Sequence, residues 1–314
     1  MQTGEDTDMR IIITGGTGFI GRQLAAELLG TGYEVVVLSR NPAKVAGLPP
    51  EVQVERWDAA SARGWGALAD GALAIVNLAG ENLAGEGFLP SRWTDARKAR
   101  IRDSRLDAGR AVVEAVSAAT LKPKVVIQSS GVGHYGTLSD KVFTESDPPG
   151  DDFLARLTVD WEASTAAVAK QGVRHVSIRS GVVLSSDEGA LNRLILPFKL
   201  FAGGPMGSGK QGFAWIHPAD EIAAIRFLIE NEAADGPFNL VAPHPTTYAE
   251  FGRTLGRVMH RPYWFPVPAF ALRTVLGEVA STVLEGQRAM PKKLLDLGFR
   301  FRFPDAESAL EDLI

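Results

Sequence analysis

A short apolar run that ends in a glycine cluster is the most constraining feature of this sequence. Residues 10–14 include three consecutive isoleucines, which predict a buried strand, and a helical pattern follows the glycines. Gly15, Gly18 and Gly21 recur every three residues, and Gly16 completes the looser G-x-G-x-x-G pattern. Backbone amides can therefore approach a pyrophosphate at the start of the helix without an intervening side chain. An ordinary glycine-rich turn is the alternative. The predicted cofactor-binding residues of this turn are Gly15, Gly16, Thr17, Gly18, Phe19, Ile20 and Gly21.

The end of the next predicted strand indicates which dinucleotide would bind. Residues 34–38 should lie beside the first strand, and Ser39 and Arg40 follow them. NAD-binding folds place a carboxylate there, on the ribose 2′-hydroxyl. A hydroxyl and a guanidinium suit a 2′-phosphate instead, because the arginine fork can bond two phosphate oxygens. The predicted cofactor is therefore NADP. A solvated arginine at a strand end is the other interpretation.

Composition restricts the classes of partner. The 314 residues suffice for one large α/β domain or two smaller ones. The formal net charge is −4 and the basic residues are scattered, so neither nucleic acid nor a membrane surface is an expected partner. The chain has no cysteine, which excludes disulfides and thiolate chemistry, and its five histidines lack metal-binding spacing. We expect a small-molecule substrate and no metal, and a homodimer stays open.

The first eight residues bear on the cellular compartment in which we expect the protein. Residues 1–8 are polar and acidic, and they lack the basic and apolar regions of an export signal. We expect them to form a disordered tail. Since no apolar run approaches membrane-spanning length, the expected location is the cytoplasm.

Strand and helix patterns alternate as far as residue 180. Helices of this length between strands imply a Rossmann-type, doubly wound parallel sheet of the α/β class, with helices on both faces. Further strands are predicted at residues 52–57, 72–78, 124–128 and 174–178, and helices at 92–119 and 152–170.

Ligands of such sheets bind beyond the carboxyl ends of the strands, which selects more cofactor candidates. Asp58 follows the third strand, where a carboxylate can accept the adenine amino group. Small residues after the fourth strand would let the backbone pass close to the ribose and nicotinamide. The further predicted cofactor-binding residues are Asp58, Leu78, Ala79, Gly80, Glu81 and Arg179.

The pattern changes at Gly181, where glycine-rich loops replace the alternation. We predict a dinucleotide-binding domain over residues 9–180, to which residues 213–242 return with a helix and a strand. Residues 181–212 and 243–314 then form a smaller domain that closes over the substrate. Its predicted helices span residues 247–258 and 269–284.

These motifs together resemble the extended short-chain dehydrogenase/reductases, the NAD(P)-dependent epimerase/dehydratase family. The resemblance is carried by residues 14–21, the strand end at 77–80, Ser129 and Ser130 with Tyr135 following, and Arg179 before Gly181. Narrower features are similar to the YfcH-like subgroup of epimerase family proteins, which has its own C-terminal domain. These are Arg97-Lys98 with Ser104-Arg105, Trp161-Glu162, residues 203–209, residues 215–220, and the ending from Pro291 to Phe301.

The resemblance also exposes a departure from the wider family. Its enzymes use a tyrosine and a lysine four residues apart, and the lysine lowers the pKa of the tyrosine so that its hydroxyl can exchange a proton. Alignment on Glu162 places Leu154 and Thr158 at these positions, and Gly131 stands where the usual serine is expected. The usual proton relay is therefore absent as a unit.

Other residues are candidates for the missing chemistry. Ser130 and Tyr135 are the predicted catalytic residues, because their loop should face the nicotinamide and a phenol there can act as a general acid. A packing tyrosine is the alternative. Glu81 can act as an acid or base, or pair with an arginine. His217 can protonate a substrate oxygen, or be structural, with Asp220 as a helix cap.

A run of basic residues occupies residues 92–105. Arg97, Ser104 and Arg105 share one side of the predicted helix and can bind an anionic group, although a solvated helix face is the commoner arrangement.

Three functions are consistent with the sequence. The first is an NADP-dependent oxidoreductase or nucleoside-sugar-type epimerase that acts on a small polar carbonyl or hydroxyl compound with an altered proton relay. The second is an NADP(H)-binding sensor or regulatory protein without turnover. The third is a scaffold or RNA-associated protein that inherited the fold.

Overall fold

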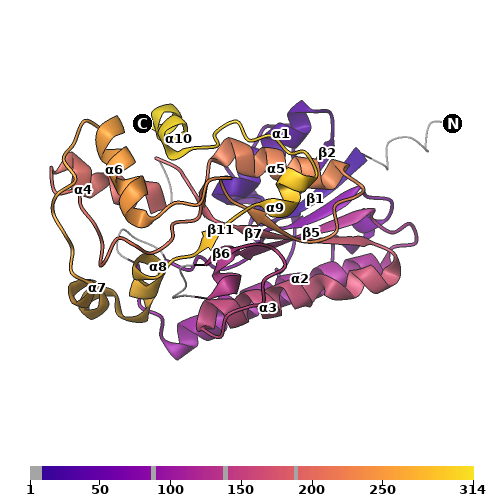
Figure 1. Ribbon diagram of the computed structural model, residues 1–314. Helices are drawn as coiled ribbons and strands as arrows, with labels where there is room; N and C mark the ends of the chain where they lie inside the picture. The colour runs from indigo at the N-terminus through magenta and orange to yellow at the C-terminus, as the bar shows by residue number, and fades with distance from the viewer. Residues whose placement is uncertain (1–8, 86–89, 137–140, 187–189) are drawn as a thin grey trace.

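A computed structural model describes residues 9–85, 90–136, 141–186 and 190–314. The expected tail at residues 1–8 lies outside these ranges. A seven-stranded parallel sheet with the order β10-β7-β5-β4-β1-β2-β3 forms the centre of the molecule (Figure 1). The predicted α/β class and Rossmann-type sheet are therefore confirmed. The strands are β1 (Arg10–Thr14), β2 (Glu34–Ser39), β3 (Gln53–Arg56), β4 (Ala74–Asn77), β5 (Val125–Gly131), β7 (Arg174–Ser180) and β10 (Gly236–Leu240).

Helices cover both faces of the sheet, which explains why β1, β2 and β4 carry uninterrupted apolar runs. Ile11 and Ile13 point to the face covered by α1 (Phe19–Gly30) and α5 (Pro218–Glu230). Ile12 points to the opposite face, where α2 (Asp95–Ala118) and α3 (Phe153–Thr165) lie. All three isoleucines are fully buried. Strand order reverses between β1 and β4, the place where doubly wound sheets bind nucleotides.

Several elements differ from the sequence predictions. Strand β5 continues to Gly131, three residues beyond the predicted end, and the 3₁₀ helix η4 (Val132–Tyr135) follows at once. Serine and glycine lowered the apparent strand propensity there, but pairing with β7 along the full length overrides it. The predicted helix 152–170 is α3 followed by the 3₁₀ helix η5 (Ala166–Gln171).

The second half of the chain also departs from prediction. The predicted helix 269–284 is broken into α7 (Ala269–Leu276), η6 (Gly277–Ala280) and α8 (Ser281–Leu284), because Gly277 has a positive φ of 64°. Helix α4 (Ala190–Lys199) lies in a stretch predicted to be loops. Its short length and Pro197 hid the helical pattern.

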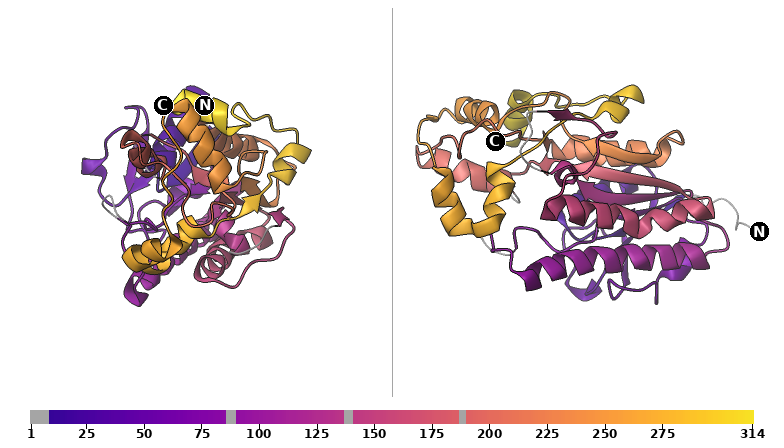
Figure 2. Two further views of the ribbon diagram at one scale, coloured as in Figure 1. Left: turned by 60° about the vertical axis from the view of Figure 1, so that its left-hand side comes forward. Right: turned by 60° about the horizontal axis from the view of Figure 1, so that its bottom comes forward.

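Residues 181–186, 190–212 and 243–314, termed the C-terminal region below, are mainly helical (Figure 2). A separate apolar cluster lies among them and also includes Trp215 and Ala242. Leu191 and Phe198 of α4 pack in this cluster with Phe251 and Leu255 of α6 (Tyr248–Val258). Two short parallel pairs join this region to the rest of the chain. They are β6 (Val142–Phe143) with β11 (Arg288–Ala289), and β8 (Val182–Val183) with β9 (Trp215–Ile216). The remaining elements are η2 (Pro42–Lys44), η3 (Gly66–Ala69), α9 (Lys292–Asp296) and α10 (Ala306–Leu313).

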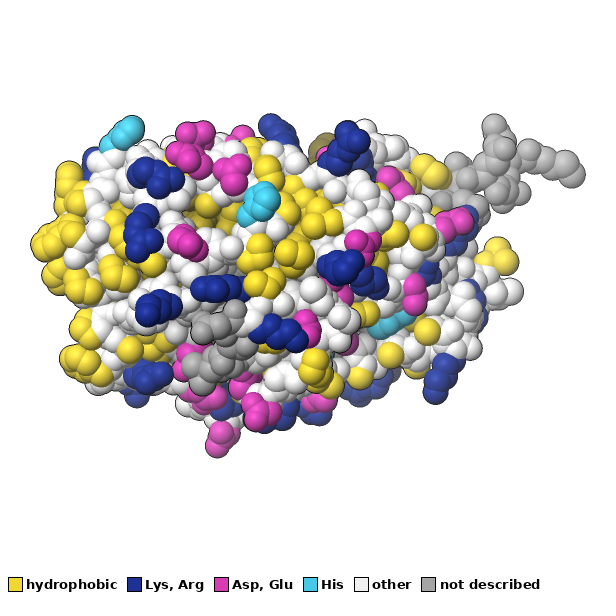
Figure 3. Space-filling model, viewed as in Figure 1, with side chains coloured by type: hydrophobic (Ala, Val, Ile, Leu, Met, Phe, Trp, Pro, Cys, Tyr) yellow, Lys and Arg dark blue, Asp and Glu magenta, His cyan; other side chains and the backbone are white. Residues whose placement is uncertain are grey.

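Apolar side chains gather on the surface of the C-terminal region (Figure 3). Leu200, Phe201, Trp264, Phe270 and Val275 are all more than half exposed. In the part of the chain that the structure describes, no helix has the length and apolar character needed to cross a bilayer.

The contact between α2 and α3 depends on a glycine. A Cβ atom added at Gly109 would lie 2.0 Å from the Oγ atom and 2.6 Å from the Cβ atom of Ser164. We expect Gly109→Ala to lower the free energy of unfolding by about 1–3 kcal/mol, since overpacking moves the helices apart. The control is Gly30→Ala in α1, where an added Cβ meets nothing within 4 Å, and we expect no loss of stability there. Urea unfolding measures both, and equal stability of the two variants would contradict the packing argument.

A buried carboxyl group makes stability depend on pH. Glu221 of α5 is fully buried, and its Oε1 atom accepts a hydrogen bond of 2.6 Å from Ser180. This hydrogen bond lowers the pKa of the carboxyl, but burial has the larger effect and raises the pKa to about 8. The unfolded chain releases this proton near pH 4.3, so the folded state holds the extra proton between that pH and about 8. The contribution of Glu221 to the free energy of unfolding is therefore largest at low pH and decreases as the pH rises toward about 8.

We therefore expect Glu221→Gln to gain stability relative to the original chain as the pH increases from 5 to 8. Urea unfolding at several pH values measures the difference, and a constant difference would show that the carboxyl does not titrate in this range.

Candidate functional site

Close backbone packing shapes the turn between β1 and α1. Gly15 has a φ of 67°, and a Cβ atom there would lie 2.8 Å from the carbonyl carbon and oxygen of Leu78. A Cβ atom at Gly21 would lie 2.5 Å from the Cα atom of Gly16, so the helix could not approach the turn. At Gly16 the obstacle would be Val37 of β2, at 2.7 Å. Side chains at these positions would push the turn, α1 and the neighbouring strand and loop apart, and this close helix–strand packing is a feature of dinucleotide-binding turns.

The first turn of α1 has the properties of an anion site. Gly18 is the N-cap residue, so no side chain caps the helix, and no acidic residue lies in its first turn. The backbone amides at this end and the helix dipole therefore remain available to a phosphate. Thr17, Phe19 and Ile20 complete the turn, and Ile20 also lines the large cavity described below. These residues fit the pyrophosphate of a dinucleotide.

The predicted adenosine end lies at the ends of the neighbouring strands β2 and β3. Ser39 is buried, and its Oγ atom accepts a hydrogen bond of 3.2 Å from the amide of Asn41. Arg40 is exposed, and its side chain has no hydrogen-bond or ion-pair partner within the described ranges. The Asp58 carboxylate accepts hydrogen bonds from the amides of Ala60 and Ser61 and from the Ser61 hydroxyl, which lowers its pKa to about 2. Asp58 thus holds its own loop, and its contact with adenine stays a prediction.

The loop after β4 is held between β1 and α2. Thr14 accepts a hydrogen bond of 3.2 Å from the amide of Ala79, and Ser104 of α2 accepts one of 3.0 Å from the amide of Glu81. A Cβ atom at Gly80 would lie 3.0 Å from Cζ of Arg105, so the loop lies directly on that guanidinium. The predicted residues Leu78 to Glu81 therefore lie beside Gly15, at the reversal of strand order.

A cavity of about 800 Å³ lies beyond the carboxyl ends of β5 and β7. Its walls come from the start of α3 and from the segment that contains α7 and α8. Most of the lining is apolar, and Trp93, Phe153 and Trp161 supply aromatic rings. Such a cavity is the ordinary location of a small-molecule site. The polar side chains on its wall include Ser129, Ser130, Thr158, Arg105, Asp152 and Gln287.

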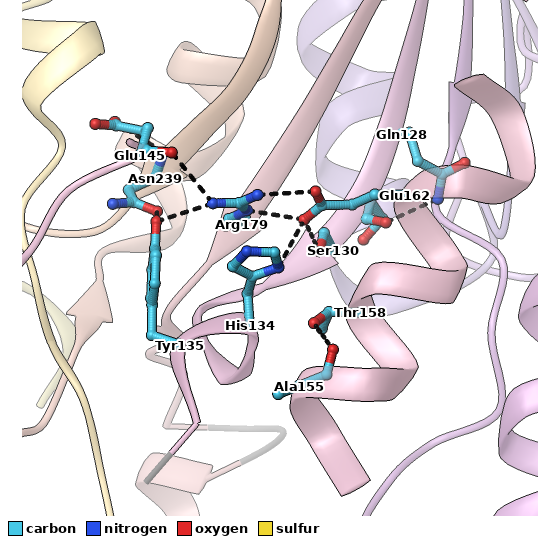
Figure 4. Close-up of polar contacts among 11 residues, drawn as sticks. Gln128, Ser130, His134, Tyr135, Glu145, Ala155, Thr158, Glu162, Arg179 and Asn239 are labelled. Carbon is cyan, nitrogen blue, oxygen red and sulfur yellow. Dashed lines mark hydrogen bonds and ion pairs between the residues drawn. The ribbon is translucent and has the colours of Figure 1, made fainter. Parts of the chain in front are cut away.

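Glu162 of α3 is the centre of the polar contacts beside this cavity (Figure 4). Arg179 of β7 donates two parallel hydrogen bonds to its carboxylate, of 2.8 and 2.9 Å, and Ser130 donates one of 2.7 Å. Burial raises the pKa of Glu162, but the bonds from Arg179 and Ser130 outweigh it, so its pKa lies below the ordinary value. The carboxylate is therefore ionised at neutral pH.

His134 lies close to the same carboxylate. Its Nδ1 atom is 3.7 Å from Oε1 of Glu162, too far for a hydrogen bond. Burial and the charge of Arg179 lower the pKa of His134 to about 4, although Glu162 opposes the shift. His134 is therefore neutral at pH 7 and makes no ion pair there.

The predicted catalytic residues Ser130 and Tyr135 have different surroundings. Ser130 lines the cavity, whereas Tyr135 is 4% exposed and is not among the lining residues. The Tyr135 hydroxyl donates a hydrogen bond of 2.6 Å to Asn239 and accepts one of 3.2 Å from Arg179. Burial is the largest influence and raises the pKa of the phenol, against the effect of Arg179. This is the packing arrangement that the sequence left as an alternative, and the general-acid role stays a prediction.

Leu154 and Thr158 both line the cavity. The Thr158 hydroxyl donates a hydrogen bond of 2.8 Å to the carbonyl of Ala155 in its own helix (Figure 4). Neither side chain can exchange a proton near neutral pH. The wall formed by α3 therefore presents no acid–base group at these two positions.

His217 and Asp220 have structural contacts. The Nδ1 atom of His217 accepts a hydrogen bond of 3.1 Å from the amide of Ala219 and so caps α5, and its ring lies against Phe303 at a tilt of 30°. Asp220 accepts hydrogen bonds from the amides of Arg302 and Phe303 and so binds the C-terminal segment, whereas the sequence suggested a helix cap.

Sequence reasoning did not assign roles to Glu162 or Asn239. In the sequence, Glu162 served only as the reference for aligning the predicted helix 152–170. The pair Trp161-Glu162 is one of the features similar to the YfcH-like subgroup, and that pair was the available signal of its importance. Asn239 lies on β10, far along the chain, and only the pairing of β10 with β7 brings it to Tyr135. Within the described ranges, no group of three potential metal ligands occurs.

Comparison with known proteins agrees with this geometry. Residues 11–241 match the model of the "NAD dependent epimerase/dehydratase family", and residues 267–313 match "Domain of unknown function (DUF1731)". The chain is 40% identical to the epimerase family protein YfhF of Bacillus subtilis, over 98% of both chains. It is 38% identical to the chloroplastic SDR39U1 homolog of Arabidopsis thaliana, over 99% of this chain and 88% of the relative.

A solved structure extends the similarity to three dimensions. The crystal structure of human epimerase family protein SDR39U1 (isoform 2) with NADPH has a TM-score of 0.87 and 35% sequence identity to this chain. The match covers 97% of this chain and 99% of the human chain. The uncapped α1, the glycine packing and the strand order thus occur in a chain that belongs to the NAD(P)-dependent epimerase/dehydratase family of extended short-chain dehydrogenase/reductases.

Proposed function

We propose that the protein is an NADP-dependent oxidoreductase or epimerase that acts on a small carbonyl or hydroxyl compound. The observation that carries this proposal is an uncapped α1 together with Arg40 at the end of β2, whose side chain has no partner among the described residues. The first suits a pyrophosphate, and the second suits the 2′-phosphate that distinguishes NADP from NAD. The NADPH in the structure of the human relative supports the choice.

Several groups would hold the cofactor. The amides of the turn from Gly15 to Gly21 would bind the pyrophosphate, and Ser39 and Arg40 would bind the 2′-phosphate. Residues 78–81 would contribute backbone contacts to the nicotinamide half. When bound, the dinucleotide supplies the group that gives or takes a hydride. The mainly apolar cavity next to it excludes water from the reacting carbon.

Proton transfer falls to Ser130 and Glu162 in this proposal. Ser130 faces the cavity and donates its proton to an ionised carboxylate, so its oxygen can accept a proton from a substrate hydroxyl while Glu162 receives the serine proton. Arg179 keeps Glu162 ionised, which favours proton removal from the substrate over proton donation. Tyr135 positions Arg179 through the hydrogen bond between them.

A sensor without turnover is the second candidate. The observation that favours it is the inert pair Leu154 and Thr158 on the cavity wall, which leaves α3 without the proton relay of the wider family. A sensor needs only a cofactor-dependent change of conformation. The two candidates differ in whether a hydroxyl compound converts bound NADP⁺ to NADPH.

Removal of the predicted phosphate contact tests the cofactor. We expect Arg40→Ala to weaken NADPH binding about 10- to 100-fold, the effect of one lost hydrogen bond to a charged group, without changing the affinity for NADH. Arg253→Ala, which removes an exposed arginine of α6, is the matched control and should leave both affinities unchanged. Fluorescence titration measures the four affinities. Equal affinity of the original chain for NADH and NADPH would contradict the assignment.

Turnover tests the proton path. With a library of hydroxyl compounds and NADP⁺, we expect Ser130→Ala to lower kcat about 10²- to 10⁴-fold, because the serine connects the substrate hydroxyl to Glu162. Tyr135→Phe should have a smaller effect, since its hydroxyl acts through Arg179. NADPH affinity should stay unchanged in both variants. Equal turnover of both variants and the original chain would remove these residues from the mechanism, and NADPH binding without any turnover would favour the sensor.

A further inference from the structure

Arg105 is a buried cation on the cavity wall with unused hydrogen-bonding capacity. It lies on α2, is 5% exposed and lines the cavity, and its Cζ atom lies 4.5 Å from the ring centre of Trp161. Its Nη1 atom donates hydrogen bonds to the carbonyl oxygens of Glu81 and Ile101, at 3.1 and 2.9 Å. Within the described ranges, no hydrogen bond is made by Nε or Nη2. Nε is shielded from solvent, whereas Nη2 is not among the buried atoms, so Nη2 is the donor that is open to a ligand.

The other charged residues on the cavity wall have partners. Glu278 receives hydrogen bonds from Lys98, Glu285 lies 3.2 Å from Arg273, and Asp152 accepts a hydrogen bond from an amide of α3. Of the cavity cations in the described part of the chain, Arg105 is therefore the one that no carboxylate contacts.

The nearest carboxylate is already shared by other arginines. Oε1 of Glu81 lies 3.7 Å from Nη1 of Arg97 and 3.7 Å from Nε of Arg100. Glu81 contributes a long-range attraction to Arg105, but burial is the larger influence and lowers the pKa of Arg105 to about 10. One carboxylate thus serves three guanidinium groups, and Arg105 still carries its charge at neutral pH.

The free edge of the guanidinium defines the ligand that fits. Nη2 presents the N–H donors of a charged group, which hydrogen-bond well to the oxygen of a carboxylate. Trp93, Phe153 and Trp161 surround the same space with apolar surface. A ligand therefore needs a compact anionic group on a mainly apolar body.

We propose that Arg105 binds the carboxylate of the substrate, so that the substrate is a mainly apolar carboxylic acid that also carries the reacting carbonyl or hydroxyl group. This inference rests on the proposed function for the reacting group, whereas the carboxylate site itself rests only on Arg105 and the cavity. It accounts for a buried charge that would otherwise be held by two carbonyl oxygens and an indole ring.

Two other roles for Arg105 predict different results. If it binds a phosphate of the cofactor, its removal weakens NADPH binding. If it only holds the loop at Glu81, its removal lowers stability without a preference for charged ligands. The test must therefore compare an acid with its uncharged amide and measure NADPH affinity separately.

The experiment uses NADPH-saturated protein and isothermal titration with benzoate and hexanoate, each compared with its amide. We expect at least one acid to bind about 10- to 100-fold more tightly than its amide, the effect of hydrogen bonds to a charged group. Arg105→Met should remove that preference, and Arg105→Lys should keep part of it, since lysine retains the charge without the planar fork. Arg102→Met, which alters an exposed arginine of the same helix paired with Asp160, should behave like the original chain.

Three results would overturn the proposal. The first is an equal affinity of the original chain for both acids and their amides. The second is a folded Arg105→Met variant that keeps the preference for the acid over the amide. The third is a loss of NADPH affinity in that variant with unchanged acid binding. Thermal unfolding identifies any variant that fails to fold, and Arg105→Lys then decides the outcome. Failure of the proposed function is a separate result, because it shows as absence of NADPH binding or turnover by the original chain.

Discussion

The close approach of two backbone turns is the constraint on which the rest of the structure depends. Gly15 lets the turn after β1 lie against Leu78 in the loop after β4, and Gly21 lets α1 begin directly on Gly16. A methyl group at either position would need space that backbone atoms occupy. Gly18, between these two glycines, leaves the N-terminus of α1 without a side-chain cap, beside the reversal of strand order. Stability of the α/β sheet and the capacity to bind a phosphate thus come from one arrangement.

A second layer of organisation is the ion pair between Glu162 and Arg179. It joins α3 to β7, and its contacts extend through Ser130 to the cavity and through Tyr135 and Asn239 to β10. Asn239 in turn donates a hydrogen bond of 3.0 Å to the carbonyl of Met290, next to β11. Two charges with this little exposure are stable together because each satisfies the other with good geometry. The ion pair therefore fixes the position of Ser130 relative to the cavity and connects it to the C-terminal region.

The sequence predicted what local patterns determine. Three isoleucines before a glycine cluster predicted β1, its turn and α1, because strand, turn and helix each leave a local signal. Contacts between residues far apart in the chain leave no local signal. The roles of Glu162 and Asn239 became visible only from the pairing of β7 with β5 and β10. Helix α4 was missed because it is short and contains Pro197. Arg105 was placed with other basic residues on one helix side, but its burial under the loop at Gly80 depends on tertiary packing.

The position of Arg105 bears on the charge of the cavity wall formed by α3, where Thr158 stands at the position for which the family resemblance implies a lysine. Thr158 and Trp161 lie three residues apart and therefore share one side of α3, and Arg105 of α2 stacks on that tryptophan. A positive charge thus reaches the wall formed by α3 from the neighbouring helix. In the proposed function, the charge and the proton path are then divided between separate residues, Arg105 and Ser130, which line one cavity. A guanidinium keeps its charge where a buried lysine readily loses it, so this division suits a role in binding an anion more than one in proton transfer.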